Sequence, residues 1–179
     1  MGFLLTGQAC SPRYNVVMKL TKHLCVALVL AGLSIGLAQA GTVRIASDLQ
    51  QDASTSRQAN LPIVLIYTAK HCHYCDEVKA AVFNPIAAAP AYRDRMLLRE
   101  VRIDTDMRLV GFKGGATNHR SFATDRGITI VPTLEFLDGS GLQVSGPLVG
   151  VSIPDYYSAY VDNGIEQAIQ NLRARRTSP

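Results

Sequence analysis

The strongest constraint on the fold of this chain is an apolar run, Leu61–Tyr67, followed closely by Cys72 and Cys75. A short apolar run of this kind is typical of a buried strand. Two cysteines three residues apart at the start of the next helix can close into one disulfide ring. The unpaired N–H groups at a helix N-terminus favour the thiolate of the first cysteine. The pattern therefore predicts a strand, a turn and a helix arranged for reversible thiol–disulfide exchange.

The first 40 residues carry the pattern of an export signal. Met18–His23 is a charged beginning, Leu24–Leu37 is apolar and uncharged, and Ala38–Ala40 offers small residues for cleavage. The apolar stretch is shorter than the roughly 20 residues that span a bilayer, which favours a cleaved signal over a membrane anchor. We therefore predict a signal peptide over residues 18–40 and a periplasmic location. Residues 1–17 fit no part of a signal, so we expect translation to start at Met18.

Cleavage after Ala40 changes how the cysteines and charges are interpreted. Cys10 and Cys25 would be removed, and residues 41–179 would hold only the pair at 72 and 75, which excludes a framework of structural disulfides. The pair is then present for its reactivity. Of the 18 Lys and Arg residues, 15 would remain beside all 14 Asp and Glu residues, so the near-neutral chain predicts no nucleic-acid partner. The length of residues 41–179 suits one domain.

The remaining patterns predict alternating helices and strands. The predicted helices cover residues 49–58, a segment from about 72 that Asn84-Pro85 should end or kink, 86–95, 118–126, and a last helix capped by Ser152. The predicted strands cover residues 62–68, 97–104, 128–131, 133–137 and 142–149, with a hairpin turn at 138–141. The last helix should bury one face, formed by Tyr157, Val161, Ile165, Ala168, Ile169 and Leu172. This order predicts an α/β fold with a mixed sheet covered by helices on both faces.

Three segments carry a resemblance to a known family: Cys72-His73-Tyr74-Cys75 after the apolar strand, Val101–Asp104, and Ile130–Thr133 before a strand and a Gly-containing hairpin. Over about residues 45–176 the chain resembles the thioredoxin superfamily. It is most similar to small exported thioredoxin-like proteins, including those found with bacterial sulfur-oxidation systems, and more distantly similar to the Dsb group. The resemblance implies a thioredoxin-like fold and a thiol–disulfide oxidoreductase that needs no bound cofactor.

The resemblance also implies roles for individual residues. Cys72 would be the exposed nucleophile, and Cys75, one turn later on the buried side, would resolve the mixed disulfide. Pro132 would be a cis-proline lying against the cysteines. The backbone of Val131 would then be free to pair with an extended substrate segment.

Four neighbouring residues are predicted to tune the cysteines: Lys70, His71, His73 and Tyr74. A positive charge on Lys70, or on either histidine when protonated, would favour the Cys72 thiolate. Asp76 and Glu77, four and five residues after Cys72, oppose this effect. The sequence alone leaves the net result open.

The chain departs from the family pattern at positions that bear on the direction of the redox reaction. Thioredoxins carry a buried acid six residues before the first cysteine, where it assists proton transfer from the second cysteine. This chain has Ile66 there, so the proton must be transferred in another way. His71 replaces the usual Trp, and His73-Tyr74 replaces Gly-Pro. Tyr74 resembles the residue found in periplasmic isomerases and reductases. Because the chain has no room for the dimerisation domain of such isomerases, a reductase is preferred over an oxidase or isomerase.

Metal delivery is the rival function, because His71, Cys72, His73 and Cys75 are four potential soft ligands within five residues. A tetrahedral structural site usually needs a second pair, and residues 41–179 offer only His119 beyond these four. We therefore expect no metal, and we place His119 on the surface. The expected partners are client proteins with disulfides or thiols and a redox protein that regenerates the pair, such as a membrane thiol electron carrier. We expect a monomer.

Overall fold

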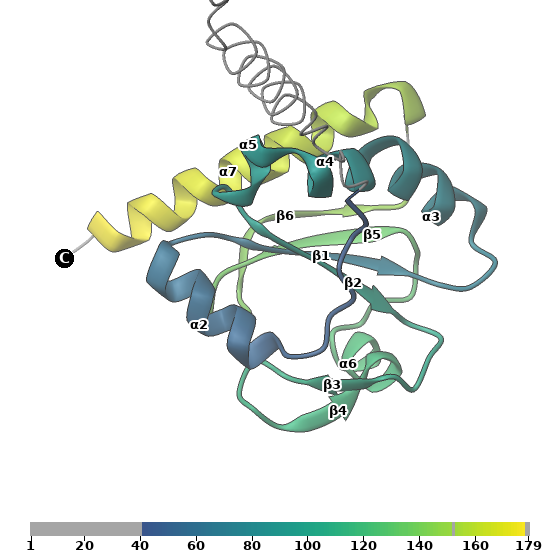
Figure 1. The fold of residues 1–179 in the computed structure, drawn as a ribbon, viewed down its shortest axis with the longest axis horizontal. Helices are drawn as coiled ribbons and strands as arrows, with labels where there is room; N and C mark the ends of the chain where they lie inside the picture. Colours follow the sequence, from purple (N-terminus) through teal and green to yellow (C-terminus); the bar gives the residue numbers. More distant parts are fainter. Residues whose placement is uncertain (1–40, 152, 178–179) are drawn as a thin grey trace, which may run out of the picture. The chain divides into compact units, whose positions relative to one another are not determined.

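The computed structural model describes residues 41–151 and 153–177 (Figure 1). They belong to the unit Gln39–Pro179. The predicted signal peptide and the predicted cap Ser152 lie outside the described residues, so neither prediction is tested. Within the described ranges, no helix is both long enough and apolar enough to cross a membrane.

A four-stranded mixed sheet forms the centre of the structure, in the order β2-β1-β5-β6 (Figure 1). Its strands are β1 (Ile63–Thr68), β2 (Leu97–Arg102), β5 (Thr133–Leu137) and β6 (Gln143–Val149). β1 runs parallel to β2 and antiparallel to β5, and β5 runs antiparallel to β6. All six residues of β1 are buried, because it has a strand on each side and helices over both faces.

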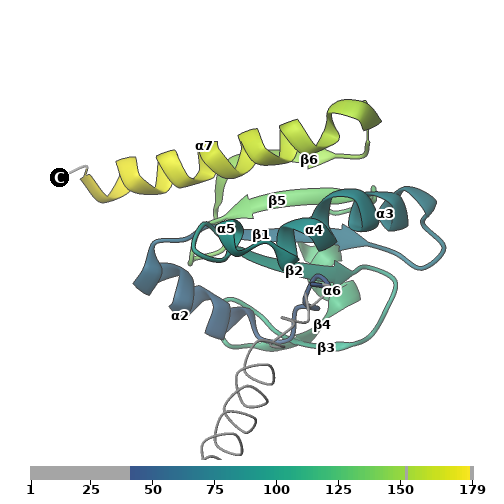
Figure 2. The same ribbon diagram turned by 45° about the horizontal axis from the view of Figure 1, so that its top comes forward.

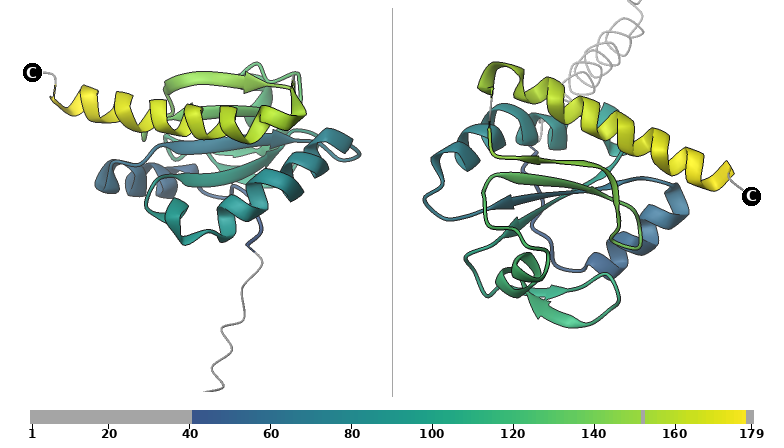
Figure 3. Two further views of the ribbon diagram at one scale, coloured as in Figure 1. Left: turned by 90° about the horizontal axis from the view of Figure 1, so that it is seen from above. Right: turned by 180° about the vertical axis from the view of Figure 1, so that it is seen from behind.

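Helices cover both faces of the sheet, as the sequence predicts (Figures 2 and 3). The helical segments are α2 (Leu49–Ala59), α3 (His73–Val78), η1 (Lys79–Phe83), α4 (Asn84–Ala88), α5 (Pro90–Arg93), α6 (His119–Asp125), η2 (Pro154–Tyr156) and α7 (Tyr157–Thr177). The segment from α3 to α4 and the long helix α7 pack on one face. Helices α2 and α6 pack on the other.

Alternation along β1 divides the core in two. Ile66 joins Phe136 of β5 and Phe83 of η1 in the core below α3 and α7. Its neighbours in β1 point the opposite way, because successive side chains of a strand alternate between faces. Tyr67 therefore packs with Phe122 of α6 in the second core. All six predicted core residues of α7 are buried, which confirms its predicted face.

The sequence predicts that Asn84-Pro85 ends or kinks the helix that follows the cysteines, and in the structure the helix does not end there. Its winding changes from α-helical to π-helical over η1 and returns to α-helical in α4. The Asn84 N–H donates to the carbonyl of Lys79, five residues back. Pro85 has no N–H to donate and occupies the first turn of α4, where proline is tolerated, so the chain stays helical to Ala88.

Two other predictions differ from the structure, and one hairpin is not predicted. The helix predicted at 86–95 is broken at Ala89, which is extended because it precedes Pro90. Residues 128–131 form no strand. The Thr133 hydroxyl donates to the carbonyl of Ile130 at 2.8 Å, a local bond that competes with sheet pairing. Between the predicted strand at 97–104 and the predicted helix at 118–126, the chain forms a small hairpin that the sequence patterns do not predict, made of β3 (Arg108–Val110) and β4 (Ala116–Asn118).

His119 is fully buried, so its predicted surface position is wrong. Its Nδ1 accepts the N–H of Arg102 at 2.9 Å, and its Nε2 lies 2.8 Å from the carbonyl of Ala46. The ring therefore joins α6 to β2 and to the segment before α2. Burial lowers the pKa of His119, and the charge of Arg102 lowers it further, against a raising effect of the Ala46 hydrogen bond.

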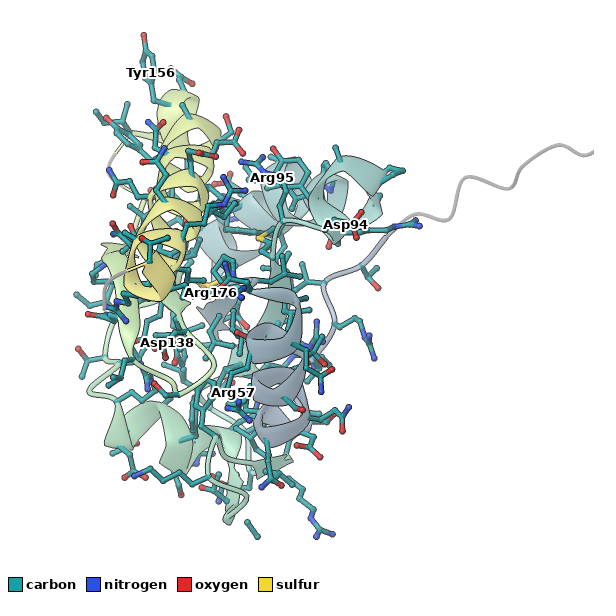
Figure 4. The ribbon with its side chains drawn as sticks, turned by 90° about the vertical axis from the view of Figure 1, so that its left-hand side faces the viewer. Arg57, Asp94, Arg95, Asp138, Tyr156 and Arg176 are labelled. Carbon is teal, nitrogen blue, oxygen red and sulfur yellow. A yellow bond between two sulfur atoms is a disulfide. The ribbon has the colours of Figure 1, made fainter. Side chains whose placement is uncertain are left out.

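The turn between β5 and β6 is tied to two helices at the end of the domain shown in Figure 4. The guanidinium of Arg57 in α2 donates to the carbonyl of Gly139 at 2.5 Å. Asp138 pairs with Arg175 near the end of α7 at 2.9 Å. The first contact ties the turn to α2, and the second ties it to the last turns of α7.

Gly164 packs tightly against the sheet, because an added Cβ would overlap the ring of Phe136. We expect Gly164→Ala to lower the free energy of unfolding by about 2 kcal/mol, since overpacking a core outweighs the helix propensity gained. Urea denaturation measures this change. Gly146→Ala is the control, because a Cβ there meets no atom within 4 Å, and it should leave stability nearly unchanged. Equal stabilities for the two variants would contradict the prediction.

The burial of His119 predicts a loss of stability in mild acid. Because the folded pKa lies below the ordinary value of 6.5, the unfolded chain binds a proton first as the pH falls. The contribution of His119 is complete above about pH 6.5 and is lost as the pH drops from there through the lower folded pKa. We expect unfolding free energies measured from pH 8 to pH 5 to fall more steeply for the wild-type chain than for His119→Gln. Parallel curves would refute this.

Candidate active site

Cys72 and Cys75 form a disulfide at the start of α3, directly after the loop that follows β1. The S–S distance is 2.11 Å and the Cα atoms are 5.2 Å apart. Cys72 is the N-cap of α3, and its Sγ accepts the N–H of Cys75 at 3.2 Å. A sulfur that caps a helix receives backbone N–H groups, which favour a negative charge on it when the disulfide is opened.

The two cysteines differ in exposure. Cys72 is partly exposed, whereas Cys75 is only 1% exposed and faces the core beneath α3. An incoming sulfur can therefore approach Cys72 from solvent, while Cys75 can react only with the sulfur of Cys72 or with a group that enters beside it. This asymmetry matches the roles expected of a nucleophile and a resolving cysteine.

The loop before Cys72 is held in an unusual backbone conformation. His71 has φ of 62°, in the left-handed region that is uncommon for a residue with a side chain. The N–H of Lys70 donates to Asp104 Oδ2 at 2.7 Å, which ties this loop to the segment after β2. The other carboxylate oxygen of Asp104 is buried and has no hydrogen-bond partner among the described residues.

His73 and Tyr74, the two residues between the cysteines, both point outward. The side chain of His73 is 80% exposed, and its Nε2 lies 3.0 Å from Glu77 Oε1. Tyr74 is 55% exposed, and its ring lies 5.9 Å from that of His73. The histidine is thus directed toward a carboxylate in the next turn of α3, and the tyrosine is available to a molecule that docks over the disulfide.

Val131 and Pro132 lie at the same end of the two central strands as the cysteine loop. Thr133 pairs with Tyr67, near the end of β1 that leads to Cys72. The Val131–Pro132 peptide bond is cis, and the Pro132 carbonyl accepts the N–H of Gly150 at 2.8 Å. Within residues 41–151 and 153–177, the backbone of Val131 forms no hydrogen bond. It is therefore free to pair with another chain.

A buried carboxylate that sequence reasoning missed lies on the sheet below α3. Glu100 of β2 is 3% exposed, and its Oε1 accepts from Thr68 Oγ1 at 2.7 Å and from Lys79 Nζ at 3.0 Å. Arg102 Nε lies 3.4 Å from the same oxygen. Glu100 pairs in register with Ile66, the position where the family pattern has its acid. The signal that could have identified it is a charged residue in the middle of the predicted strand at 97–104.

The environment of Glu100 keeps it ionised. Burial alone would raise the pKa of this carboxyl. Hydrogen bonds from Thr68 and Lys79, together with the charges of Lys79 and Arg102, lower it below its usual value. Glu100 is therefore a buried anion balanced by cations, on the sheet face that carries the cysteine helix.

The comparison with protein-family models matches residues 49–165 to the thioredoxin-like domain. The chain belongs to the thioredoxin-like family. Together with the Cys72–Cys75 disulfide, this makes the thioredoxin-like protein a thiol–disulfide oxidoreductase. No curated protein matched it. Among the described residues, no group of three or more His, Cys, Asp or Glu side chains is placed to hold a metal ion.

Several solved structures resemble the thioredoxin-like protein in fold. Oxidised thioredoxin O2 from Arabidopsis thaliana is 20% identical, with 70% of this chain and 96% of that chain covered and a TM-score of 0.46. Thioredoxin from Trichomonas vaginalis is 17% identical, with 70% and 96% covered and a TM-score of 0.47. The oxidised C-terminal domain of DsbD from Neisseria meningitidis is 19% identical, with 67% and 98% covered and a TM-score of 0.44.

Proposed function

We propose that this protein is exported to the periplasm and reduces disulfides of client proteins, with Cys72 as the nucleophile and Cys75 as the resolving cysteine. The observation that carries the proposal is the contrast between a partly exposed Cys72 and a buried Cys75 in one disulfide ring. The free backbone of Val131 at the same end of the central strands suits pairing with an extended client segment.

The reaction proceeds through two exchanges. The Cys72 thiolate attacks one sulfur of the client disulfide, that S–S bond breaks, and the other client sulfur leaves as a thiolate that takes up a proton. The Cys75 thiol then loses its proton and attacks Cys72. This forms the ring disulfide and releases the first client sulfur, which is protonated in turn. The client gains two electrons, and a dithiol donor must reduce the ring disulfide for the next cycle.

The surroundings of Cys72 favour the reducing direction. Disulfide-forming proteins are strong oxidants because their reduced thiolate is strongly stabilised. Here the carboxylates of Asp76 and Glu77 lie one turn beyond Cys72, and His73 is directed to Glu77. Asp76 has no ion-pair partner in the described part of the chain. These anions destabilise the reduced thiolate, so the dithiol passes its electrons to client disulfides more readily and is the better reductant.

The partners we propose follow from this direction. Electrons would come from a membrane thiol carrier, and the clients would be periplasmic proteins with disulfides, as suits a protein resembling those that accompany sulfur-oxidation systems. The domain would act as a monomer and would need no bound cofactor.

The reduction potential of the Cys72/Cys75 couple tests the direction. We expect a value near or below about −250 mV on equilibration with glutathione and dithiothreitol, whereas a value above about −180 mV would indicate an oxidase or isomerase. Glu77→Gln should raise the potential, because it removes an anion and frees His73. Asp94→Asn, which removes the same charge beyond α5 (Figure 4), should leave it unchanged. A couple that does not cycle would refute the proposed function.

Export is tested separately on the full chain. When the protein is expressed in a Gram-negative host, we expect it in the periplasmic fraction with Gly41 as its first residue, identified by intact mass and N-terminal sequencing. A substitution that blocks cleavage, Ala40→Leu, should leave the longer form at the membrane. Recovery of the full-length chain in the cytoplasm would contradict the proposed location.

A further inference from the structure

Glu100 stands on the sheet face that the cysteine helix covers. Leu98 and Glu100 point to the same side of β2, and Leu98 packs in the core with Val78 and Val82 of that helix. Thr68, which donates to Glu100, is the last residue of β1 and lies four residues before Cys72. The buried carboxylate is therefore placed under the redox centre by two adjacent strands.

Lys79 connects Glu100 to the helix that begins at Cys72. Its ammonium lies 3.0 Å from the carboxylate, and its side chain is 24% exposed. Lys79 follows Cys72 by seven residues, which is two turns on one helix face, or about 10 Å along the axis.

A cavity of about 360 Å³ joins the ion pair to the loop before Cys72. Glu100 and Lys79 line it together with Lys70 and His71. Apart from His71, its walls carry three cations and three carboxylates: Lys70, Lys79 and Arg102, and Asp76, Glu100 and Asp104. Loss of any one of these charges leaves a net unit charge beside the redox centre.

We propose that the Lys79–Glu100 ion pair is a positioning device that sets how readily Cys72 loses its proton, and thereby the potential of the Cys72/Cys75 couple. The pair acts by charge and does not store the proton, because Glu100 is held as a carboxylate by its partners. The inference rests on the proposed role of Cys72 as the nucleophile. It assigns the control of Cys72 ionisation to Glu100 of β2 and Lys79 of the cysteine helix, because the uncharged Ile66 cannot exert it.

If the pair acts by charge, removing its anion and removing its cation must shift the ionisation of Cys72 in opposite directions, which a purely structural contact would not do. Without the carboxylate, the unbalanced Lys79 and Arg102 charges favour the Cys72 thiolate. Without the ammonium, the carboxylate disfavours it. A unit charge about 10 Å from a thiol changes its thiolate fraction by roughly twofold in water and by about tenfold or more in a less polar medium.

The experiment measures the alkylation rate of Cys72 by iodoacetamide from pH 5 to pH 9 in a Cys75→Ser background. At a pH where the thiol is mostly protonated, we expect Glu100→Gln to react about threefold faster and Lys79→Met about threefold slower. The double variant should return close to the parent rate. In the chain with both cysteines, Glu100→Gln should raise the reduction potential and Lys79→Met should lower it.

Unchanged rates in both single variants, or shifts in the same direction, would overturn the inference. If the buried anion left by Lys79→Met prevents folding, the inference is tested with Glu100→Gln and Lys79→Arg instead. Faster reaction of the first and the parent rate of the second support the ion pair, and an unchanged rate in Glu100→Gln overturns it. Glu166→Gln, which breaks the exposed pair with Arg95, is the matched control and should have no effect.

The proposed function and the inference fail in different ways. Reductase activity retained by Cys72→Ser would refute the nucleophile and with it the proposed function. If Cys72→Ser loses activity but the Glu100 and Lys79 substitutions leave the alkylation rate unchanged, the proposed function stands and only the inference is refuted.

Discussion

The pairing of β1 with a strand on each side is the interaction on which the site depends. Because β1 is buried along its whole length, its register with β2 and β5 is specified by both cores. The parallel register brings Glu100 beside Ile66, and the antiparallel register brings Thr133 beside Tyr67. The cysteines, the buried carboxylate and the Val131–Pro132 segment therefore converge at one end of the central strands without being neighbours in sequence.

Charge near the cysteines is divided between an exposed and a buried group of residues. On the exposed side, His73 is engaged by Glu77, and the carboxylates of the first turns oppose a thiolate on Cys72. On the buried side, the carboxylate of Glu100 is balanced by Lys79 and Arg102. Exposed charges are screened by water and salt, whereas buried charges are screened much less. An unbalanced buried charge would therefore act on Cys72 more strongly than an exposed charge at the same distance, and pairing keeps the buried charges balanced.

Features set by local pattern could be predicted from the sequence, and features set by distant contacts could not. The strand at 63–68, the cysteine helix and the buried face of α7 follow from periodicity and spacing. His119 looked like a surface residue because its partners, Arg102 and Ala46, belong to elements far along the chain. Glu100 was missed for the same reason, since its burial depends on Thr68 and Lys79. The signal peptide stays a prediction.

The change of winding after α3 links the helix to this electrostatic arrangement. Lys79 begins the π-helical segment, and its carbonyl accepts the N–H of Asn84 while its side chain pairs with Glu100. Segments of π-helix inside α-helices frequently occur at functional sites. Here the wider turn starts at the residue that joins the helix to the sheet, two turns after Cys72. A shift of the helix relative to β2 would therefore alter the ion pair and the surroundings of Cys72 together, because one residue belongs to both.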